Sequence, residues 1–521
     1  MEGNLLFVGG DLSGIQKFIY NITSKRAMVS LKGRSYYLKD FTKDVYDEIL
    51  DIPEIKNSQF KREKMEIYCS GGKFYLQVPD TKSIRNAIVG IRKTTEKKLW
   101  NEHQGQLSIN IDFVPFTYEG DKVKVDGETD NIGLLWTKIT ENFNALKNKK
   151  FKSLLLEDNL FEVQKVGGDV KVCQITGIEG AKEYTFNFKD SDGEKQDVLT
   201  ILPSVKEQID LGLRLRDKQH FKMLEEYADG TYLGVLRMDV DNLGSRFVKS
   251  DFKSMNEYKD FSKKLDTFFD AEEGNLHTIQ EQNKEHLNIV YAGGDDIFVV
   301  GRWDKVIDFA NDVRTQFAAY CKEVLNDTSL SISGGIAIVN AKYPIAKAAE
   351  MAGEAEEAAK KYNNGKKNAF NMFGESVSWN GEFNYVKSYK KQFVSLIDKC
   401  GLSRGILHKI MTYAAIVKEN QTIEEENKNG NYKRKPDMSY LWHAAYYLTR
   451  FMGKEKDNKG VYDFCKDLRD KQLVKTDNYR LVSLAARWAE LELREIKDSI
   501  NNKMNNYGLE QTRFNSAERN H

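Results

Sequence analysis

Three aspartates that follow strand-like segments are the residues of this chain best suited to chemistry. Asp239 follows the run 233–238, and Asp295 and Asp296 directly follow Gly293-Gly294. Carboxylates gathered at one place repel each other and require cations, and hard oxygen ligands suit Mg²⁺ or Mn²⁺, which also bind substrate phosphates. Two such ions can activate a ribose hydroxyl and stabilise a pyrophosphate leaving group. We therefore predict that Asp239, Asp295 and Asp296 are the catalytic metal ligands of a nucleotidyl transfer site.

Residues around this set are candidates for holding a nucleotide. Gly293-Gly294 would let a bulky anion approach the backbone closely. Asp241 would either hold a second metal ion or, together with Asn242, cap the helix that follows. Lys366 and Lys367 lie in a polar turn after a helix, where they would either contact a triphosphate or form a solvated helix end. Both interpretations of Asp241 and of the two lysines stay open from the sequence.

An internal repeat predicts the elements that position these residues. The first copy has strand-like runs at 5–8, 65–68, 74–78 and 107–113, with helical stretches from residue 13 and over about 81–102. The second copy keeps this order, with strand-like runs at 233–238, 287–291, 297–300 and 330–338 and helical stretches over about 252–282 and 303–325. Each copy therefore predicts the order β-α-β-β-α-β, which is the ferredoxin-like unit.

The connectivity of this unit explains how carboxylates far apart in the sequence can meet. The third strand lies beside the first, so the end of the first strand meets the hairpin between the second and third strands. This places Asp239 beside Asp295-Asp296. Aligning Tyr68 with Tyr291 sets Gly72-Lys73 against Asp295-Asp296, so the hairpin carboxylates belong to the second copy alone.

The chain as a whole is predicted to have an α+β fold with four domains. We expect a first ferredoxin-like domain, a small mixed insertion domain, a second ferredoxin-like domain with the carboxylates and an all-helical C-terminal domain, with boundaries at 1–120, 121–225, 226–375 and 376–521. Within these domains we expect a lysine-rich helix at 146–152 and an exposed loop at the charged stretch 419–435.

Composition excludes several classes of protein. The 521 residues include 79 Lys and Arg against 78 Asp and Glu, so the chain is no polycation, although a local basic groove is compatible with this balance. No run of roughly 18 apolar residues occurs and the N-terminus resembles no secretory signal, so we expect a cytoplasmic protein without a membrane span. The five cysteines stand singly, without a Cys-x-x-Cys pair, so we expect no zinc site.

Four motifs of the chain resemble those of one family. They are Gly10-Asp11-Leu12-Ser13-Gly14-Ile15, Ser70-Gly71-Gly72-Lys73-Phe74, Met238-Asp239-Val240-Asp241-Asn242 and Tyr291-Ala292-Gly293-Gly294-Asp295-Asp296. In this order they resemble the large subunit of type III CRISPR effector complexes, closest to the Csm type, over nearly the whole chain. The resemblance implies two palm domains packed face to face, a small insertion domain and a helical C-terminal domain.

For function, the resemblance implies a target-RNA-activated nucleotidyltransferase that joins ATP 3′–5′ into cyclic oligoadenylates, the second messengers of antiviral defence. It implies assembly with guide RNA, target RNA and other effector subunits. The second palm would carry the three metal-binding aspartates. The first palm would help to hold the second nucleotide, with Ser13, Gly71 and Gly72 as candidates.

Two departures from the family pattern change these expectations. Many members begin with an HD nuclease domain, whereas this sequence has no His-Asp pair, so we expect no DNase activity of that type. Relatives often carry a zinc ion in the insertion domain. Cys173 stands alone there, where two cysteines would be needed, so we expect no zinc in this chain.

Three alternatives stay open at this point. The same palm chemistry could join AMP to another acceptor, such as S-adenosylmethionine. A diguanylate-cyclase-like enzyme would share the palm, but Asp295-Asp296 differs from the glutamate-containing pattern of that family, and two palms in one chain argue against it. A non-catalytic scaffold that docks on guide RNA would leave the carboxylates idle. Nucleotide turnover by a variant with alanine at 295 and 296 discriminates between an enzyme and a scaffold.

Overall fold

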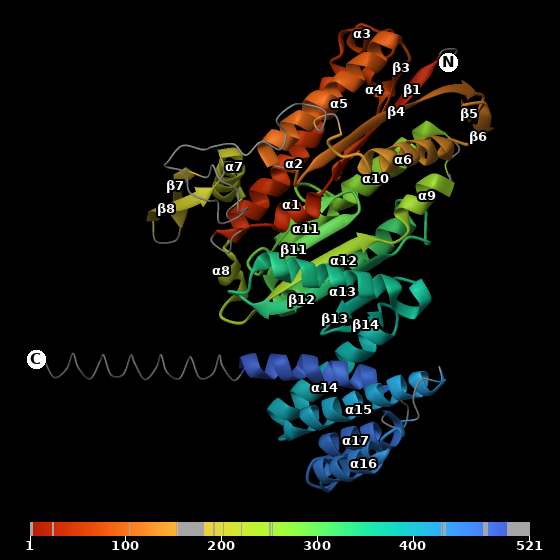
Figure 1. The fold of residues 1–521 in the computed structure, drawn as a ribbon. Helices are drawn as coiled ribbons and strands as arrows, with labels where there is room; N and C mark the ends of the chain where they lie inside the picture. The colour runs from red at the N-terminus through yellow and green to blue at the C-terminus, as the bar shows by residue number, and fades with distance from the viewer. Residues whose placement is uncertain are drawn as a thin grey trace, which may run out of the picture. The chain divides into compact units, whose positions relative to one another are not determined.

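The computed structural model separates into two compact units, Met1–Asn368 and Ala369–His521 (Figure 1). The structure describes residues 4–22, 26–103, 105–152, 154, 182–190, 193–201, 203–219, 221–249, 252, 254–428, 430, 434–472 and 478–496. Both sheets of the predicted repeat lie in the first unit. The four domain boundaries expected from the sequence stay predictions.

The first sheet is built from the first copy of the repeat. Its elements are β1 (Leu5–Ser13), α1 (Ile15–Tyr20), α2 (Ala27–Leu50), α3 (Pro53–Lys56), α4 (Arg62–Met65), β2 (Glu66–Ser70), β3 (Lys73–Pro79), α5 (Lys82–His103), β4 (Ser108–Glu119), β5 (Lys122–Val125), β6 (Glu128–Asp130) and α6 (Gly133–Lys147). The strand order is β2-β3-β1-β4-β5-β6. Strand β1 therefore lies between β3 and β4 and pairs antiparallel with both.

The second sheet repeats this arrangement. Its elements are α8 (Leu224–Ala228), β9 (Tyr232–Val240), α9 (Leu243–Lys249), α10 (Met255–Phe269), α11 (Asn275–Glu281), β10 (Leu287–Gly293), β11 (Asp296–Arg302), α12 (Trp303–Glu323), β12 (Ile332–Asn340) and α13 (Ile345–Gly365). The strands run in the order β10-β11-β9-β12, so β9 occupies the place that β1 has in the first sheet. Between the two sheets in sequence lie the antiparallel pair β7 (Lys182–Asp190) and β8 (Gly193–Ile201), and α7 (Pro203–Gln219).

Strand β1 shows why its sequence is a continuous apolar run. Phe7 faces α6, where its ring lies 4.8 Å from that of Trp136. Leu6 and Val8 point to the opposite face and join the core cluster that includes Leu31 of α2 and Ile88 of α5. Because both faces of the sheet are covered by helices, alternation of polar and apolar residues is absent from this strand.

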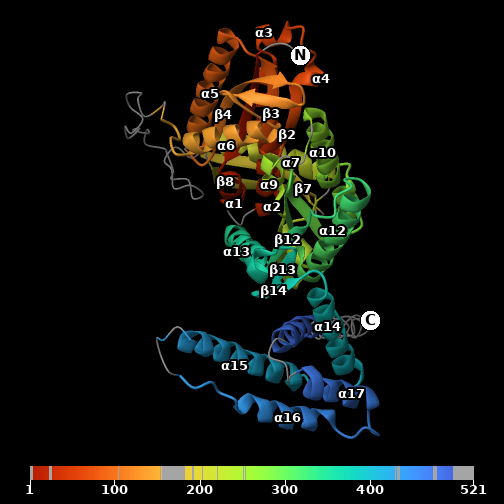
Figure 2. The ribbon, with the colours of Figure 1, turned by 90° about the vertical axis from the view of Figure 1, so that its right-hand side faces the viewer.

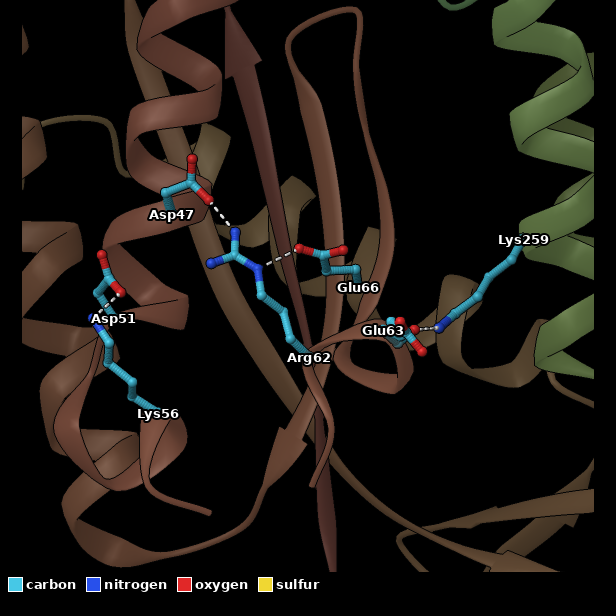
Figure 3. A network of polar contacts seen from close by, with 7 residues as sticks. All are labelled: Asp47, Asp51, Lys56, Arg62, Glu63, Glu66 and Lys259. Atoms are coloured by element: carbon cyan, nitrogen blue, oxygen red, sulfur yellow. Dashed lines mark hydrogen bonds and ion pairs between the residues drawn. The ribbon is translucent and has the colours of Figure 1, made fainter. Parts of the chain in front are cut away.

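One hydrophobic core joins the two sheets. The cluster that holds Leu6 and Val8 continues into the second sheet through Val235 and Phe298. Polar contacts support this packing at its edge, where Lys259 of α10 reaches the segment before β2 (Figure 3). The two sheets are therefore packed as one body within the first unit.

The second unit is mainly helical (Figure 2). It contains the hairpin β13 (Ala369–Met372) and β14 (Glu375–Ser378), the helices α14 (Glu382–Lys399), α15 (Gly405–Lys428), α16 (Ser439–Met452) and α17 (Lys459–Asp467), the π-helical turn Leu468–Gln472 and a helix at 478–496. No helix in the described ranges is long and apolar enough to cross a bilayer.

Two local predictions were wrong. The stretch 419–435 is not a loop throughout, because α15 continues to Lys428. Its buried residues Val417, Asn420 and Ile423 recur at helical spacing and hold it in place. The lysine-rich stretch 146–152 is not a helix, because α6 ends at Lys147 and turns follow it. Surface lysines in this stretch offer no apolar face that would extend the helix.

The crossing of α2 and α7 is tight enough to require glycine. A Cβ at Gly33 would lie 1.7 Å from the carbonyl oxygen of Gln208, so Gly33→Ala forces the helices apart. We expect it to lower the free energy of unfolding by about 1–3 kcal/mol or more. Gly90→Ala on α5 is the control, because nothing lies within 4 Å of that Cβ and alanine favours a helix. Thermal unfolding should show a fall for the first and a small rise for the second, and equal shifts would contradict the crossing.

Candidate functional site

The structure brings the three predicted carboxylates together at one end of the second sheet. Asp239, near the end of β9, is directly opposite Asp296, the first residue of β11. The carbonyl oxygen of Asp295 accepts a hydrogen bond from the backbone N–H of Val240, 3.2 Å away. The hairpin and the strand end are therefore fixed to each other by backbone pairing, as the connectivity predicts.

The electrostatics of this cluster are those of a site that needs cations. Burial raises the pKa of Asp239 to about 7 and, together with Asp239, that of Asp295 to about 6. The pKa of Asp296 is also raised to about 6, by burial first and then by the charge of Asp295. Half-buried carboxylates that disfavour their own charged forms are suited to bind a positive ligand.

A lysine occupies the space beside Asp239. The Nζ atom of Lys360, on α13, lies 2.7 Å from an oxygen of Asp239 and 2.6 Å from Glu356. Glu356 also pairs with Arg237 at 3.1 Å. Burial by itself lowers the pKa of Lys360, but the two carboxylates raise it above its ordinary value. The pKa of Asp239 rises as well, against the effect of Lys360, because burial outweighs the ion pair.

The donor set fits a divalent cation in chemistry but is not gathered around a common point. In the described part of the chain, no three His, Cys, Asp or Glu side chains lie close enough together to hold a metal ion. Lys360 explains this for Asp239, because its ammonium group holds one carboxylate oxygen. Metal binding at these residues therefore requires Lys360 to release Asp239.

Sequence reasoning missed Lys360, Glu356 and Arg237. A signal was present in α13, where the buried face is a stripe of alanines that Glu356 interrupts. A charged residue in a buried stripe needs a partner, and Lys360 follows it by one helical turn. Attention to the two lysines of the following turn obscured this pair.

A cavity of about 1190 Å³ opens above the carboxylates. Asp239 and Asp296 lie in its wall, together with residues of α13 that include Lys360 and Lys361. The other wall comes from the first copy of the repeat, through residues of α1 and the turn after it: Gln16, Lys17, Tyr20 and Asn21. The cavity is therefore shared by both copies and is large enough for a nucleotide.

The glycine pairs lie where the two hairpins touch. A Cβ at Gly293 would lie 2.9 Å from the Cα of Gly71, and a Cβ at Gly71 would lie 3.0 Å from the carbonyl of Gly293. Gly71, Gly72 and Gly294 all have positive φ values. In this structure the glycines allow two backbones to approach each other, and their contact with a nucleotide stays a prediction.

The first copy keeps an acid at the position equivalent to Asp239. Asp11 pairs in register with Lys73, as Asp239 pairs with Asp296. An oxygen of Asp11 lies 2.6 Å from Nζ of Lys147, at the end of α6. Two lysines therefore replace the cation-binding carboxylates of the second copy. Ser13, two residues further, is half-buried and accepts a hydrogen bond from Asn110.

Asp241 lies in a separate polar pocket. Its Oδ2 atom accepts hydrogen bonds from the hydroxyls of Ser331 (2.6 Å) and Ser333 (3.0 Å) and from the backbone N–H of Asn368 (3.0 Å). Its Oδ1 atom is buried without a hydrogen-bond partner among the described residues. Asn242 beside it is exposed, with a positive φ of 62°. One oxygen is thus used to join three segments, and the other is left for a ligand.

Replacing Asp241 with alanine should separate its structural role from metal binding. We expect the free energy of unfolding to fall by about 1–3 kcal/mol, because two hydroxyls and an amide lose their acceptor. We expect the number of Mn²⁺ ions bound to stay unchanged, because the engaged oxygen already has three donors. Thermal unfolding and a Mn²⁺ titration measure the two effects. A lower Mn²⁺ stoichiometry in the variant would instead make Asp241 a metal ligand.

Lys366 and Lys367 do not line the cavity. They follow a stretch in which Asn363, Asn364 and Gly365 have positive φ values, so α13 has left its helical path before them. Their contact with a triphosphate stays a prediction. Cys173, where a zinc ligand was considered, lies outside the described residues.

Comparison with known proteins places this geometry in a family. Residues 232–371 match the family described as Cas10/Cmr2, second palm domain, and residues 4–166 match Csm1 subunit domain B. Among solved structures, the crystal structure of an apo Csm1-Csm4 cassette has a TM-score of 0.61 at 20% identity, covering 94% of this chain and 70% of that chain. This likeness shows a shared fold.

Curated relatives carry the name CRISPR system single-strand-specific deoxyribonuclease Cas10/Csm1 (subtype III-A). The one from Enterococcus italicus is 26% identical, covering 72% of this chain and 54% of the relative. The one from Mycobacterium tuberculosis is 27% identical, covering 69% and 53%. The chain spans about half the length of these relatives.

Fold and matches together define a protein with a palm domain of the Cas10 type. The two matched ranges take in more than half of the chain. The chain belongs to the Cas10/Csm1 family, the large subunits of type III-A CRISPR systems.

Proposed function

We propose that this chain is a nucleotidyltransferase that converts ATP to 3′–5′ cyclic oligoadenylates, second messengers of antiviral defence. The observation that carries the proposal is the pairing of Asp239 with Asp296, next to Asp295, in the wall of a cavity that both palm-like copies line. A site that joins two nucleotides needs one wall for each of them. The cavity supplies the two walls from separate copies of the repeat.

Solved structures with the same fold support the choice of substrate. Their titles describe Csm1-Csm4 cassettes in complex with one ATP and with the cyclic oligoadenylate cA4. These structures are about 20% identical to this chain, so they carry the substrate here only as a proposal. The same titles name Csm4 as the partner in the type III-A interference complex. We extend this to assembly with such a subunit, guide RNA and target RNA.

The proposed reaction forms one bond and breaks one. The 3′ oxygen of one nucleotide attacks the α-phosphorus of the other, the bond between the α-phosphorus and the bridging oxygen breaks, and pyrophosphate leaves with the electron pair. Asp239, Asp295 and Asp296 would hold Mg²⁺ or Mn²⁺, which lowers the pKa of the attacking hydroxyl and neutralises the leaving group. Lys360, once free of Asp239, would lie beside the phosphates. Most of the rate then comes from positioning and electrostatics.

The first copy would hold the acceptor nucleotide. Ser13, Gly71 and Gly72 were the sequence candidates, and α1 adds Gln16 and Asn21 at the cavity wall. The acid of this copy, Asp11, is already paired with Lys147. The first copy is therefore suited to bind a nucleotide without a metal ion of its own.

Turnover of ATP by the assembled complex tests the proposal. The complex would be incubated with ATP and Mg²⁺ or Mn²⁺, with and without matching target RNA, and products would be identified by mass spectrometry. Cyclic adenylates that require target RNA are the expected result. An AMP adduct formed only with S-adenosylmethionine would keep the site and change the acceptor. No nucleotide product from the target-bound complex would leave the scaffold as the better account, and single-stranded DNA in parallel reactions tests the activity in the relatives' names.

A further inference from the structure

Helix α10 contacts the first sheet at two points that are seven residues apart. Lys259 and Asp266 lie on one side of the helix because seven residues make about two turns. Nζ of Lys259 donates to the carbonyl oxygens of Glu63 (3.0 Å) and Lys64 (3.1 Å), just before β2 begins (Figure 3). Asp266 accepts a hydrogen bond from the hydroxyl of Ser70, where β2 ends. One helix of the second copy thus holds both ends of a strand of the first.

Apolar and ionic contacts make this attachment firm. The ring of Tyr258, next to Lys259, lies 4.1 Å from that of Trp136 on α6. On the other side of β2, Arg62 bridges Asp47 (2.6 Å) and Glu66 (2.7 Å) and fixes the start of the strand to α2 (Figure 3). The start of β2 is therefore held by several groups, whereas its end at the hairpin is held to α10 through Ser70.

The end of β2 leads into the contact between the two hairpins. Gly71 follows Ser70 and packs on Gly293, and a Cβ at Gly294 would lie 2.8 Å from the hydroxyl of Tyr68. Glycines bring backbones close but provide no side chain that could lock them in one position. The distance between the hairpin tips must therefore be set by groups outside them. Asp266 is half-buried, and burial, with a smaller contribution from Asp295, raises its pKa to about 7.

We propose that Asp266 is a positioning residue that holds the hairpin of the first copy, through Ser70, in register with the Gly293–Asp296 hairpin that carries the catalytic aspartates. The proposal rests on the proposed function, since its effect is the spacing between the two nucleotide walls. Asp266 touches neither nucleotide in this account. It acts through Ser70 and Gly71, and Lys259 serves the same attachment at the other end of the strand.

Four variants in the assembled complex test the proposal. Asp266→Ala removes the acceptor, Asp266→Asn keeps an oxygen that Ser70 can reach, and Ser70→Ala removes the donor. Asp260→Asn is the matched control, since Asp260 lies on the same helix, is exposed and pairs with Lys264 of that helix. Two quantities are measured: amide hydrogen exchange of residues 70–74 and 293–296, and kcat and KM for ATP.

We expect Asp266→Ala and Ser70→Ala to speed exchange at both hairpins and to lower kcat by about tenfold or more, the size of a lost hydrogen bond to a charged group, with little change in KM for ATP. Asp266→Asn should recover most of kcat, and the double variant should be no worse than either single one. Unchanged exchange in Asp266→Ala would overturn the proposal, as would faster exchange with unchanged kcat. Exchange is read without turnover, so an inactive wild-type complex would refute the proposed function and leave the attachment separately testable.

Discussion

Replacing Asp295 and Asp296 together with asparagine is expected to abolish conversion of ATP while making the folded protein more stable. The loss of activity should be at least about a thousandfold, because a metal site supplies several kcal/mol of transition-state stabilisation and each 1.36 kcal/mol is a factor of ten. Asparagine keeps the shape of the hairpin, so the loss cannot come from altered packing. The two effects have opposite signs because the site gathers charges that folding disfavours.

The gain in stability follows from the direction of the pKa shifts. The folded protein holds protons on Asp295 and Asp296 up to a pH of about 6, whereas the ordinary carboxyl value is 3.8. Between these values the folded state binds more protons than the unfolded state, so the free energy of unfolding falls as the pH rises. At pH 7 both carboxylates are charged and destabilise the fold. Neutral asparagines remove this destabilisation.

Thermal unfolding at pH 5 and pH 7, together with product analysis, measures both effects. The variant should unfold at a higher temperature than the wild type at pH 7, and its pH dependence should be weaker. Mg²⁺ should stabilise the wild type and leave the variant unchanged. Asp304→Asn is the control, because its pKa is lowered by Arg302, so its loss should destabilise the fold and keep activity. A destabilised Asp295/Asp296 variant would contradict the electrostatic account of the site.

Replacing Lys360 with alanine is expected to lower kcat/KM for ATP by about a hundredfold, the effect of removing one group that stabilises developing charge. Lys360 is the cation that contacts Asp239, and it lies in the wall of the cavity. The variant should also be less stable, because Asp239 and Glu356 lose a shared partner while they stay largely buried. Steady-state kinetics and thermal unfolding measure these effects.

Lys361 provides a matched control for Lys360. It lines the same cavity, but its side chain is 80% exposed and its nearest acid, Glu357, lies 3.9 Å away. Lys361→Ala should change kcat/KM by no more than about twofold, as for exposed ion pairs. Equal losses in both variants would show that the cavity acts through its overall charge and would refute a specific role for Lys360.

Much of the framework could be predicted because strand ends and glycine pairs are local signals. The repeat aligned Tyr68 with Tyr291, and both strands carry a register irregularity just before these tyrosines. The meeting of Asp239 with Asp296 then followed from connectivity. Lys360 and the wall formed by α1 could not be predicted in the same way, because they depend on how a helix packs over the sheet.

The position of a bound metal ion tests the central claim most directly. Crystals of the protein with Mn²⁺ and a non-hydrolysable ATP analogue would locate the ion by its anomalous scattering. We expect Mn²⁺ in contact with Asp239 and with Asp295 or Asp296, and Lys360 displaced from Asp239 toward the phosphates. An ion bound elsewhere, with the 2.7 Å pair of Lys360 and Asp239 intact, would contradict the account.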